Sequence, residues 1–220
     1  MGKGTSLIPV VVIAILVFSL LFVYYNFSQK SISNEIQFPT QIVTATSIST
    51  TATVSKPTIN ISSLEPQIHA LINQQRALNG LDQLSYDINL VSIARYHSQD
   101  MAENNYFSHT DLANHDFVYR YQMFGYACKI LIQTFENGTS LFSEGAENLA
   151  QNNLYDSITY VNGVPIYNWN TQNQIAASTV SGWMNSTGHR ENILTYYWKN
   201  EGIGVAIASD GKVYITENFC

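Results

Sequence analysis

The stretch Ser181-Gly-Trp-Met-Asn-Ser-Thr-Gly-His-Arg-Glu-Asn-Ile-Leu194 is the segment around which the chain is organised. Apolar residues at helical spacing lead into it, and Gly188 is of a type that commonly ends helices, so the pattern predicts a helix over residues 171–187. His189 is then expected just after the helix end, where it can face a cleft. Histidine can act near neutral pH as a base, an acid or a metal ligand. A capping or packing role is the alternative for a single histidine beside a glycine.

The composition argues against a nucleic-acid partner. The chain has 220 residues, of which 12% are charged, and a formal net charge of -6. Residues 64–220 alone carry 7 basic and 15 acidic residues, a net of -8. A nucleic-acid-binding face needs clustered lysine and arginine, and this acidic region lacks them.

The first 30 residues are interpreted as a cytoplasmic flank followed by a transmembrane helix. Residues 7–25 are uncharged and would be about 28 Å long as a helix, enough to cross a bilayer core. No clear Ala-x-Ala-like cleavage site follows, so we expect the anchor to be retained. The short flank containing Lys3 favours a cytoplasmic amino terminus, which predicts a single-pass protein with its C-terminal domain outside the cell.

Residues 31–63 are predicted to form a disordered stalk. They are rich in serine and threonine, nearly uncharged and without helical periodicity. This composition suits sugar attachment, and the chain is expected to be a glycoprotein. Sequons for N-linked sugars occur at Asn26, Asn60, Asn137 and Asn185.

Residues 64–220 are predicted to form one domain that contains at least three helices. Apolar residues at helical spacing predict helices over 65–79 and 87–104, in addition to the helix over 171–187. Asn79-Gly80 is a typical helix stop, and Asp87 is a plausible cap for the second helix.

Strands are predicted in the same domain. Residues 204–208 and 212–216 alternate around Asp210-Gly211, a favoured hairpin turn, and residues 160–164 indicate a second short hairpin. Residues 127–135 fit a strand or a short helix. Because strands of this kind need a helical layer over them, the sequence predicts the α+β fold class.

Two further residues are candidates to meet His189. His109 follows the end of the helix over 87–104. Glu147 comes directly after Gly145-Ala146, which allow close approach of the backbone, and its carboxylate could be a general base or a metal ligand. A solvated loop glutamate is the alternative. His97, in contrast, lies on an apolar helical stripe and is expected to be a core histidine with a satisfied hydrogen bond.

Cys128 and Cys220 are the only cysteines of the chain. We expect them to form a disulfide, because a pair in an exported domain is more often bridged than free. No neighbouring residue indicates an activated thiolate, so a cysteine nucleophile is not expected.

Four motifs occur in this order within residues 64–220: Tyr106-Phe-Ser-His109, Gly145-Ala-Glu-Asn-Leu-Ala150, Trp183-Met-Asn-Ser-Thr-Gly-His-Arg-Glu-Asn-Ile-Leu194 and Gly202-Ile-Gly-Val-Ala206. Together they resemble the CAP superfamily in a prokaryotic form. This is the SCP domain of cysteine-rich secretory proteins, antigen 5 and plant pathogenesis-related 1 proteins. The resemblance implies a three-layer α-β-α sandwich with an antiparallel sheet, in an extracellular setting.

The resemblance also implies a cleft with two histidines and two glutamates, which often binds zinc or another divalent ion. His109, Glu147 and His189 match three of these positions. Ser186 occupies the position of the second family glutamate. Glu191 or Glu144 could replace that glutamate, but nothing in the sequence places either carboxylate in the cleft. A triad of metal ligands is therefore expected. The preceding family glycine is Ala146 here, a mild change. Residues 123–143 and 152–170 look like insertions that could wall or cover the cleft.

Three functions are compatible with these features. The first is a membrane-tethered module that binds a lipid, glycan, peptide or cell-surface protein, as the resemblance suggests. The second is a metal-dependent hydrolase, a peptidase or esterase, in which the two histidines and Glu147 hold zinc with a water in the fourth position. The third is a structural role on the cell envelope. Binding is favoured because no second carboxylate is secured as a general base.

Overall fold

The computed structural model describes residues 55–220. The predicted membrane anchor and most of the predicted stalk lie outside these residues, so both stay predictions. No helix within residues 55–220 has the length and apolar character that a membrane span requires.

The described chain has runs of strands and pairs of successive helices, as the α+β prediction requires. The helices and strands are α2 (Ile61–Leu78), β1 (Ser85–Tyr86), α3 (Ile88–Asn104), α4 (Phe117–Met123), β2 (Ile130–Thr134), β3 (Ser140–Ser143), β4 (Ala146–Asn153), β5 (Tyr155–Val161), β6 (Val164–Trp169), α5 (Gln172–Asn185), α6 (Thr187–Ile193), β7 (Asn200–Ile207) and β8 (Lys212–Phe219).

Local signals place several of these boundaries. The Asp87 side chain accepts a hydrogen bond from the Asn89 amide and caps α3, as predicted. Gly80, with φ 73°, follows the end of α2, which confirms the predicted stop. The start of α2 was predicted wrongly, because the helix begins at Ile61, inside the range assigned to the stalk.

The central sheet has the strand order β1-β7-β8-β4. β7 and β8 form the predicted hairpin around Asp210-Gly211, and β4 pairs antiparallel with β8. The expectation of a wholly antiparallel sheet was wrong, because β1 pairs parallel with β7. The long connection between β1 and β7 contains several helices, and a parallel pair needs such a crossover.

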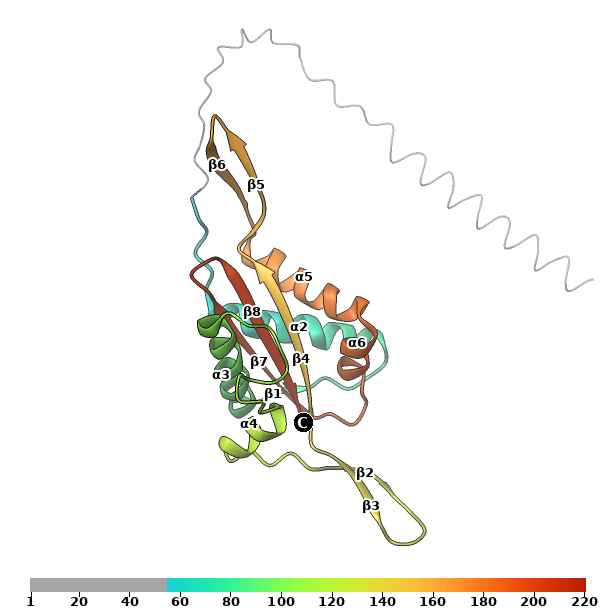
Figure 1. Cartoon of the computed structure of the whole chain (residues 1–220). Coiled ribbons are helices and arrows are strands. Elements are labelled where there is room, and N and C mark those ends of the chain that lie inside the picture. The colour runs from blue at the N-terminus through green and yellow to red at the C-terminus, as the bar shows by residue number, and fades with distance from the viewer. Residues whose placement is uncertain (1–54) are drawn as a thin grey trace, which may run out of the picture. The chain divides into compact units, whose positions relative to one another are not determined.

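Helices cover both faces of this sheet (Figure 1). On one face, α3 packs directly on the backbone of β7, and added Cβ atoms at Gly202 and Gly204 would lie 2.3 Å and 2.1 Å from α3 backbone atoms. On the other face, α2 and α5 pack on apolar side chains of β7 and β8, which include Ile203, Val205 and Ile215. The arrangement is the expected helix-sheet-helix sandwich.

Two hairpins project from opposite ends of the sheet (Figure 1). β2 pairs with β3, which resolves the ambiguity over residues 127–135 in favour of a strand. β5 pairs with β6 around the predicted Asn162-Gly163 turn, and both turn residues have positive φ. These hairpins lie within the two stretches that the sequence marked as insertions.

Cys128 and Cys220 form the predicted disulfide, which joins residues 92 positions apart. It packs in a small buried cluster with Leu90, Ile93 and Tyr121. The Tyr121 hydroxyl donates to the Phe219 carbonyl at 3.0 Å. The disulfide and this hydrogen bond tie the segment before β2 to the end of β8.

Candidate functional site

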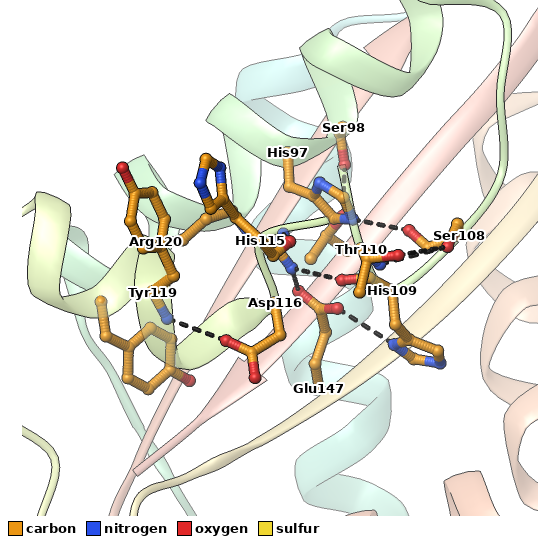
Figure 2. Close-up of polar contacts among 12 residues, drawn as sticks. His97, Ser98, Ser108, His109, Thr110, His115, Asp116, Tyr119, Arg120 and Glu147 are labelled. Carbon is orange, nitrogen blue, oxygen red and sulfur yellow. Dashed lines mark hydrogen bonds and ion pairs between the residues drawn. The ribbon is translucent and has the colours of Figure 1, made fainter. Parts of the chain in front are cut away.

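His109 and Glu147 meet at the edge strand β4. Figure 2 shows the Glu147 carboxylate between the His109 ring and the Arg120 guanidinium. His109 Nδ1 lies 3.0 Å from Glu147 Oε1. Because a carboxylate oxygen accepts, Nδ1 is the protonated nitrogen of His109, and Nε2 stays open. His109 and Glu147 are therefore in contact, as the sequence predicted.

His189 lies near His109. Burial lowers the pKa of His189, and the nearby His109 imidazole lowers it further. His109 and His189 therefore lie close enough to interact electrostatically, and His189 stays neutral to a lower pH than an ordinary histidine.

The predicted position of His189 after a helix end was wrong. α5 ends at Asn185, Ser186 has extended backbone angles, and α6 begins at Thr187, so His189 lies inside a second short helix. Gly188 has no positive φ and continues α6. Ser186, rather than Gly188, separates the two helices.

Glu147 is held by a buried ion pair. Arg120, on α4, donates from Nη2 to Glu147 Oε2 at 2.6 Å, and both side chains are only 1% exposed. Arg120 also donates to the carbonyls of His109 and His115 at 3.1 Å and 3.2 Å. One guanidinium thus neutralises the carboxylate and fixes the loop that carries His109.

His97 supports the same loop from the core. It is fully buried, and its Nε2 donates to the Ser108 carbonyl at 2.9 Å. Burial lowers the pKa of His97. The prediction of a core histidine is confirmed, and its Nε2 bond positions the residue next to His109, whereas Nδ1 is buried without a hydrogen-bond partner among the described residues.

The short helix α6 is pinned by side chains from three other segments. Asn148 donates to the His189 carbonyl at 3.1 Å, and its Oδ1 accepts from Asn192 at 2.8 Å. The buried Arg76 of α2 donates to the Ile193 carbonyl at 2.7 Å, at the C-terminal end of α6. Trp198 Nε1 donates to the Asn192 carbonyl at 3.0 Å. These bonds hold His189 in place although α6 has only 7 residues.

The other predicted cleft residues make no contact with the triad through their side chains. Glu144 and Glu191 are exposed, and neither carboxylate forms a hydrogen bond with another group in the described part of the chain. Ser186 is partly buried and serves as the junction between α5 and α6. No second carboxylate therefore joins Glu147 among residues 55–220.

The contacts of Glu147 do not favour it as a third metal ligand beside the two histidines. Across residues 55–220, no group of three or more His, Cys, Asp or Glu side chains is arranged to hold a metal ion. Both oxygens of Glu147 are engaged, one by His109 and one by Arg120. A carboxylate that accepts from Nδ1 of a histidine orients its Nε2 toward a metal. The zinc site with Glu147 as third ligand stays a prediction.

A second polar cluster lies on the opposite face of the sheet, and it was not predicted. Glu201 and Glu217 are fully buried and close enough for each to shift the pKa of the other. His69 Nδ1 contacts Glu201, and Asn148 donates to Glu217 at 2.8 Å. Asn148 thus belongs both to this cluster and to the cleft, because it also binds the His189 carbonyl.

The hydrogen bonds of the second cluster determine where its protons lie. Asn73 Oδ1 accepts from the Leu84 amide and Asn73 Nδ2 donates to the Leu84 carbonyl, which fixes the orientation of the Asn73 amide. His69 Nε2 faces Asn73 Nδ2 at 3.1 Å and must accept, so His69 is neutral and donates from Nδ1 to Glu201. Burial lowers the pKa of His69, which agrees with a neutral imidazole.

Burial favours the protonated forms of Glu201 and Glu217. Oε1 of each carboxylate has no donor among the described residues unless the other carboxylate is protonated. Burial raises the pKa of Glu217 well above its ordinary value and the pKa of Glu201 to about 7. A protonated Glu217 can donate to Glu201, which also accepts from His69.

Sequence reasoning missed Arg120, Glu201 and Glu217. Glu217 carried a usable signal, because it lies two residues after Ile215 in a strand with period-2 alternation and so faces the core. Glu201 precedes the Gly202-Ile-Gly motif and gave no comparable signal. Arg120 lies on α4, a helix of 7 residues that no periodicity marked.

The chain is similar to two proteins of Bacillus subtilis (strain 168). It is 32% identical over 155 residues to the uncharacterized membrane protein YlbC, in an alignment that covers 70% of this chain and 34% of YlbC. It is 29% identical over 175 residues to the uncharacterized protein YkwD, in an alignment that covers 80% of this chain and 53% of YkwD. The aligned region is about a third to a half of each relative's length.

Solved structures share the fold. An extracellular protein containing a SCP domain from Bacillus anthracis str. Ames superposes with a TM-score of 0.51 at 25% identity, over 75% of this chain and 44% of that chain. An outer surface protein from Borrelia burgdorferi superposes with a TM-score of 0.51 at 18% identity, over 75% of this chain and 97% of that chain, which supports the fold alone. Residues 69–219 match the model of the cysteine-rich secretory protein family, and the chain therefore belongs to this family, the CAP proteins.

Proposed function

We propose that this chain is a membrane-tethered extracellular module that binds a ligand through the cleft containing His109 and His189. Residues 7–25 would be the anchor and residues 64–220 the binding domain. The names of two relatives support this setting, since one is described as a membrane protein and another as an extracellular protein. The ligand would be a lipid, glycan, peptide or protein of a cell surface.

One observation favours binding over hydrolysis: both oxygens of the Glu147 carboxylate are already engaged, by Arg120 and by His109. A carboxylate whose two oxygens already accept hydrogen bonds from the protein is poorly positioned to take a proton from a bound water. In residues 55–220, no serine or threonine hydroxyl is hydrogen-bonded to the His109 or His189 ring, and both cysteines are in the disulfide. The cleft therefore offers imidazoles but no activated nucleophile.

Zinc or another divalent metal fits this function as a bridge to the ligand. His109 Nε2 and the His189 ring would hold the ion, and Glu147 would orient His109 from behind. A bound metal would supply a Lewis acid with open positions that a ligand oxygen or nitrogen can occupy. The chain's own residues fix the two imidazoles, through Arg120 on one side and Asn148 on the other.

Zinc calorimetry on the full-length protein tests the cleft. We expect binding at about pH 7.5 and weaker binding at about pH 5.5, because ligation requires neutral imidazoles. His109→Ala and His189→Ala should each remove the heat of binding. His115→Ala is the matched control, since His115 is a partly exposed histidine that pairs with Asp111. Heat that survives in both cleft variants would exclude the metal part of the proposal.

Turnover assays separate the binding module from a hydrolase. Peptide and ester libraries incubated with the full-length protein, with and without zinc, should show no metal-dependent cleavage. If cleavage requires zinc and is lost in His189→Ala, the protein is a hydrolase and the binding proposal is wrong.

A further inference from the structure

The outer half of the β5–β6 hairpin is apolar, exposed and uncharged. Four large side chains beside its turn are between 49% and 67% exposed: Tyr160, Val161, Val164 and Ile166. Residues 157–189 contain no Asp, Glu, Lys or Arg. A contiguous group of exposed apolar side chains commonly marks a surface that meets a partner. The tip of this hairpin, residues 160–166, is therefore a candidate interaction surface.

An aromatic row at the hairpin base holds the tip in place. Trp169 packs against the main hydrophobic core, and Tyr167 stacks on it at 4.8 Å between ring centroids. Tyr155 packs edge-on against Tyr167 at 5.2 Å. The three rings share one face of the hairpin, because Tyr155 pairs with Trp169 and Tyr167 lies two residues before Trp169. A two-stranded hairpin is marginally stable alone, and this row joins it to the core.

The other projecting hairpin, β2–β3, has a charged tip. It also exposes apolar side chains, among them Leu141 and Phe142. However, Glu136 lies in its turn, and Lys129 directly precedes β2. Moving a carboxylate from water into an apolar phase is costly. Of the two hairpins, only β5–β6 can bury its tip without burying a charge.

The described chain enters the domain beside the base of β5–β6 (Figure 1). The Asn60 amide donates to Gln172 Oε1 at 3.2 Å, and β6 ends nearby in the sequence, at Trp169. The predicted stalk and anchor precede Asn60 in the sequence. Treated as a flexible coil, residues 31–60 would span roughly 30 Å. Tethering at this distance keeps the hairpin at a high effective concentration relative to lipid, so a weak affinity is enough.

Lipid fits this tip better than a strand of another protein does. Pro165 pairs with Tyr160 next to the two-residue turn, so its nitrogen faces the open edge of β6 and offers no N–H to an added strand. Tyrosine favours the boundary between lipid and water. Within residues 55–220, the outer edges of β5 and β6 pair with no third strand, and such backbone groups must stay hydrated. The tip can therefore enter a bilayer only to a shallow depth.

We propose that the tip of the β5–β6 hairpin docks on the outer surface of the membrane that holds the chain. Tyr160, Val161, Val164 and Ile166 would lie in the interfacial region of the bilayer. The inference rests on the membrane tether of the proposed function. Docking would orient the domain, because the β2–β3 hairpin, at the opposite end of the sheet, would then point away from the membrane (Figure 1).

Quenching by brominated lipid tests the docking in the full-length protein, reconstituted into phosphatidylcholine nanodiscs. Val164→Trp places an indole at the tip, whereas the native Trp183 and Trp198 are buried. Brominated acyl chains should reduce the emission of this variant more than that of the wild type. Leu141→Trp is the matched control, since Leu141 is exposed on the β2–β3 hairpin, and it should be quenched no more than the wild type.

A charge at the tip should release it. Ile166→Asp, added to Val164→Trp, should lower the docked fraction by at least about tenfold and restore the emission, because the docked state loses a buried aliphatic side chain. Quenching that persists in this double variant contradicts docking through the apolar tip. Quenching that requires phosphatidylglycerol contradicts it as well, since the tip has no cation to attract an anionic lipid.

The remaining outcomes separate this inference from the proposed function. If the protein co-purifies with the nanodiscs but Val164→Trp is quenched no more than the wild type, the tether holds and the docking is wrong. If the protein does not co-purify with the nanodiscs, both the tether and the docking are wrong. A shift of the Val164→Trp emission to shorter wavelength without quenching would mean that protein, and not lipid, covers the tip.

Discussion

The Glu147 cluster and the Glu201–Glu217 cluster lie on opposite faces of the β1-β7-β8-β4 sheet. Glu147 pairs in register with Asn218, on the face that α3 covers, and Glu217 pairs with Asn148, on the face that α2 covers. Both clusters contain fully or almost fully buried carboxylates. They differ in what offsets the negative charge: a bonded guanidinium acts at Glu147, whereas burial raises the pKa of Glu201 and of Glu217 and favours their protonated forms.

This difference separates a site that is built around a fixed charge from one that responds to pH. A guanidinium is not a group that titrates in the physiological range, so the Arg120–Glu147 pair can hold the His109 loop without a dependence on pH. Arg76 lies near Glu201 and lowers its pKa, but its bonded donors contact main-chain carbonyls. The second cluster therefore depends on a proton that the solvent can remove.

The largest expected effect comes from breaking the Arg120–Glu147 pair. Arg120→Met should lower the free energy of unfolding by about 3 to 5 kcal/mol, because it leaves a buried carboxylate without its cation. Urea or thermal unfolding of the full-length protein measures this loss.

The double variant Arg120→Met/Glu147→Gln should recover part of that stability, since no unpaired charge remains. Lys212→Met, which breaks the exposed pair with Asp210, should have little effect. Equal stability of the single and the double variant would show that Glu147 is not charged in the folded protein.

The next effect is the pH dependence of the Glu201–Glu217 pair. A carboxyl group whose pKa is raised on folding binds more protons in the folded than in the unfolded state, so stability is greatest below the unfolded pKa and falls as pH rises. With the pKa of Glu201 raised from 4.5 to about 7, this loss occupies the range between those values, and Glu217 extends it to higher pH.

The melting temperature should therefore be higher at about pH 5 than at about pH 8. Glu217→Gln mimics the protonated partner, because a carboxamide can donate to Glu201 and accept from Asn148. The substitution should raise stability at the higher pH and flatten the profile. If the melting temperature of Glu217→Gln depends on pH as that of the wild type does, protonation of Glu217 does not stabilise this cluster.

The smallest effect is the one that the second cluster should have on the cleft. Glu147→Gln should weaken zinc binding about 10- to 100-fold, the usual cost of losing a carboxylate behind a ligating histidine. Glu217→Gln should change zinc affinity by less than about twofold, because Asn148 keeps its bond to the His189 carbonyl. Calorimetry on the two variants compares them directly. A large loss in Glu217→Gln would mean that the clusters act as one unit through Asn148.

Much of the fold could be predicted because its signals are local. The Asp87 cap, the Gly80 stop and the turns at Asp210-Gly211 and Asn162-Gly163 each depend on a few adjacent residues. The Gly188 prediction failed because glycine ends a helix only where the chain takes up a left-handed conformation, and Gly188 does not. The parallel pairing of β1 could not be predicted, because a strand of two residues is too short to show a period-2 alternation.

The site could be predicted only in part. The family motifs identified His109, Glu147 and His189, and the structure brings His109 to Glu147 and near His189. Arg120 could not be found from sequence, because its role depends on how the chain after α3 folds back over β4. The partnership of Glu201 and Glu217 depends on strand register, which places two residues 16 positions apart on the same face of a sheet.

The packing of α3 on β7 also limits how this sequence can vary. At Gly204 an added Cβ would lie 2.1 Å from the Arg95 amide nitrogen, and at Gly202 it would lie 2.3 Å from the Leu90 carbonyl carbon. Those atoms belong to the helix backbone and cannot rotate away as a side chain can, so even alanine is excluded. Gly182 and Gly188 have open space where a Cβ would stand. Evolutionary drift can therefore change the two glycines around His189 far more readily than the two beneath α3.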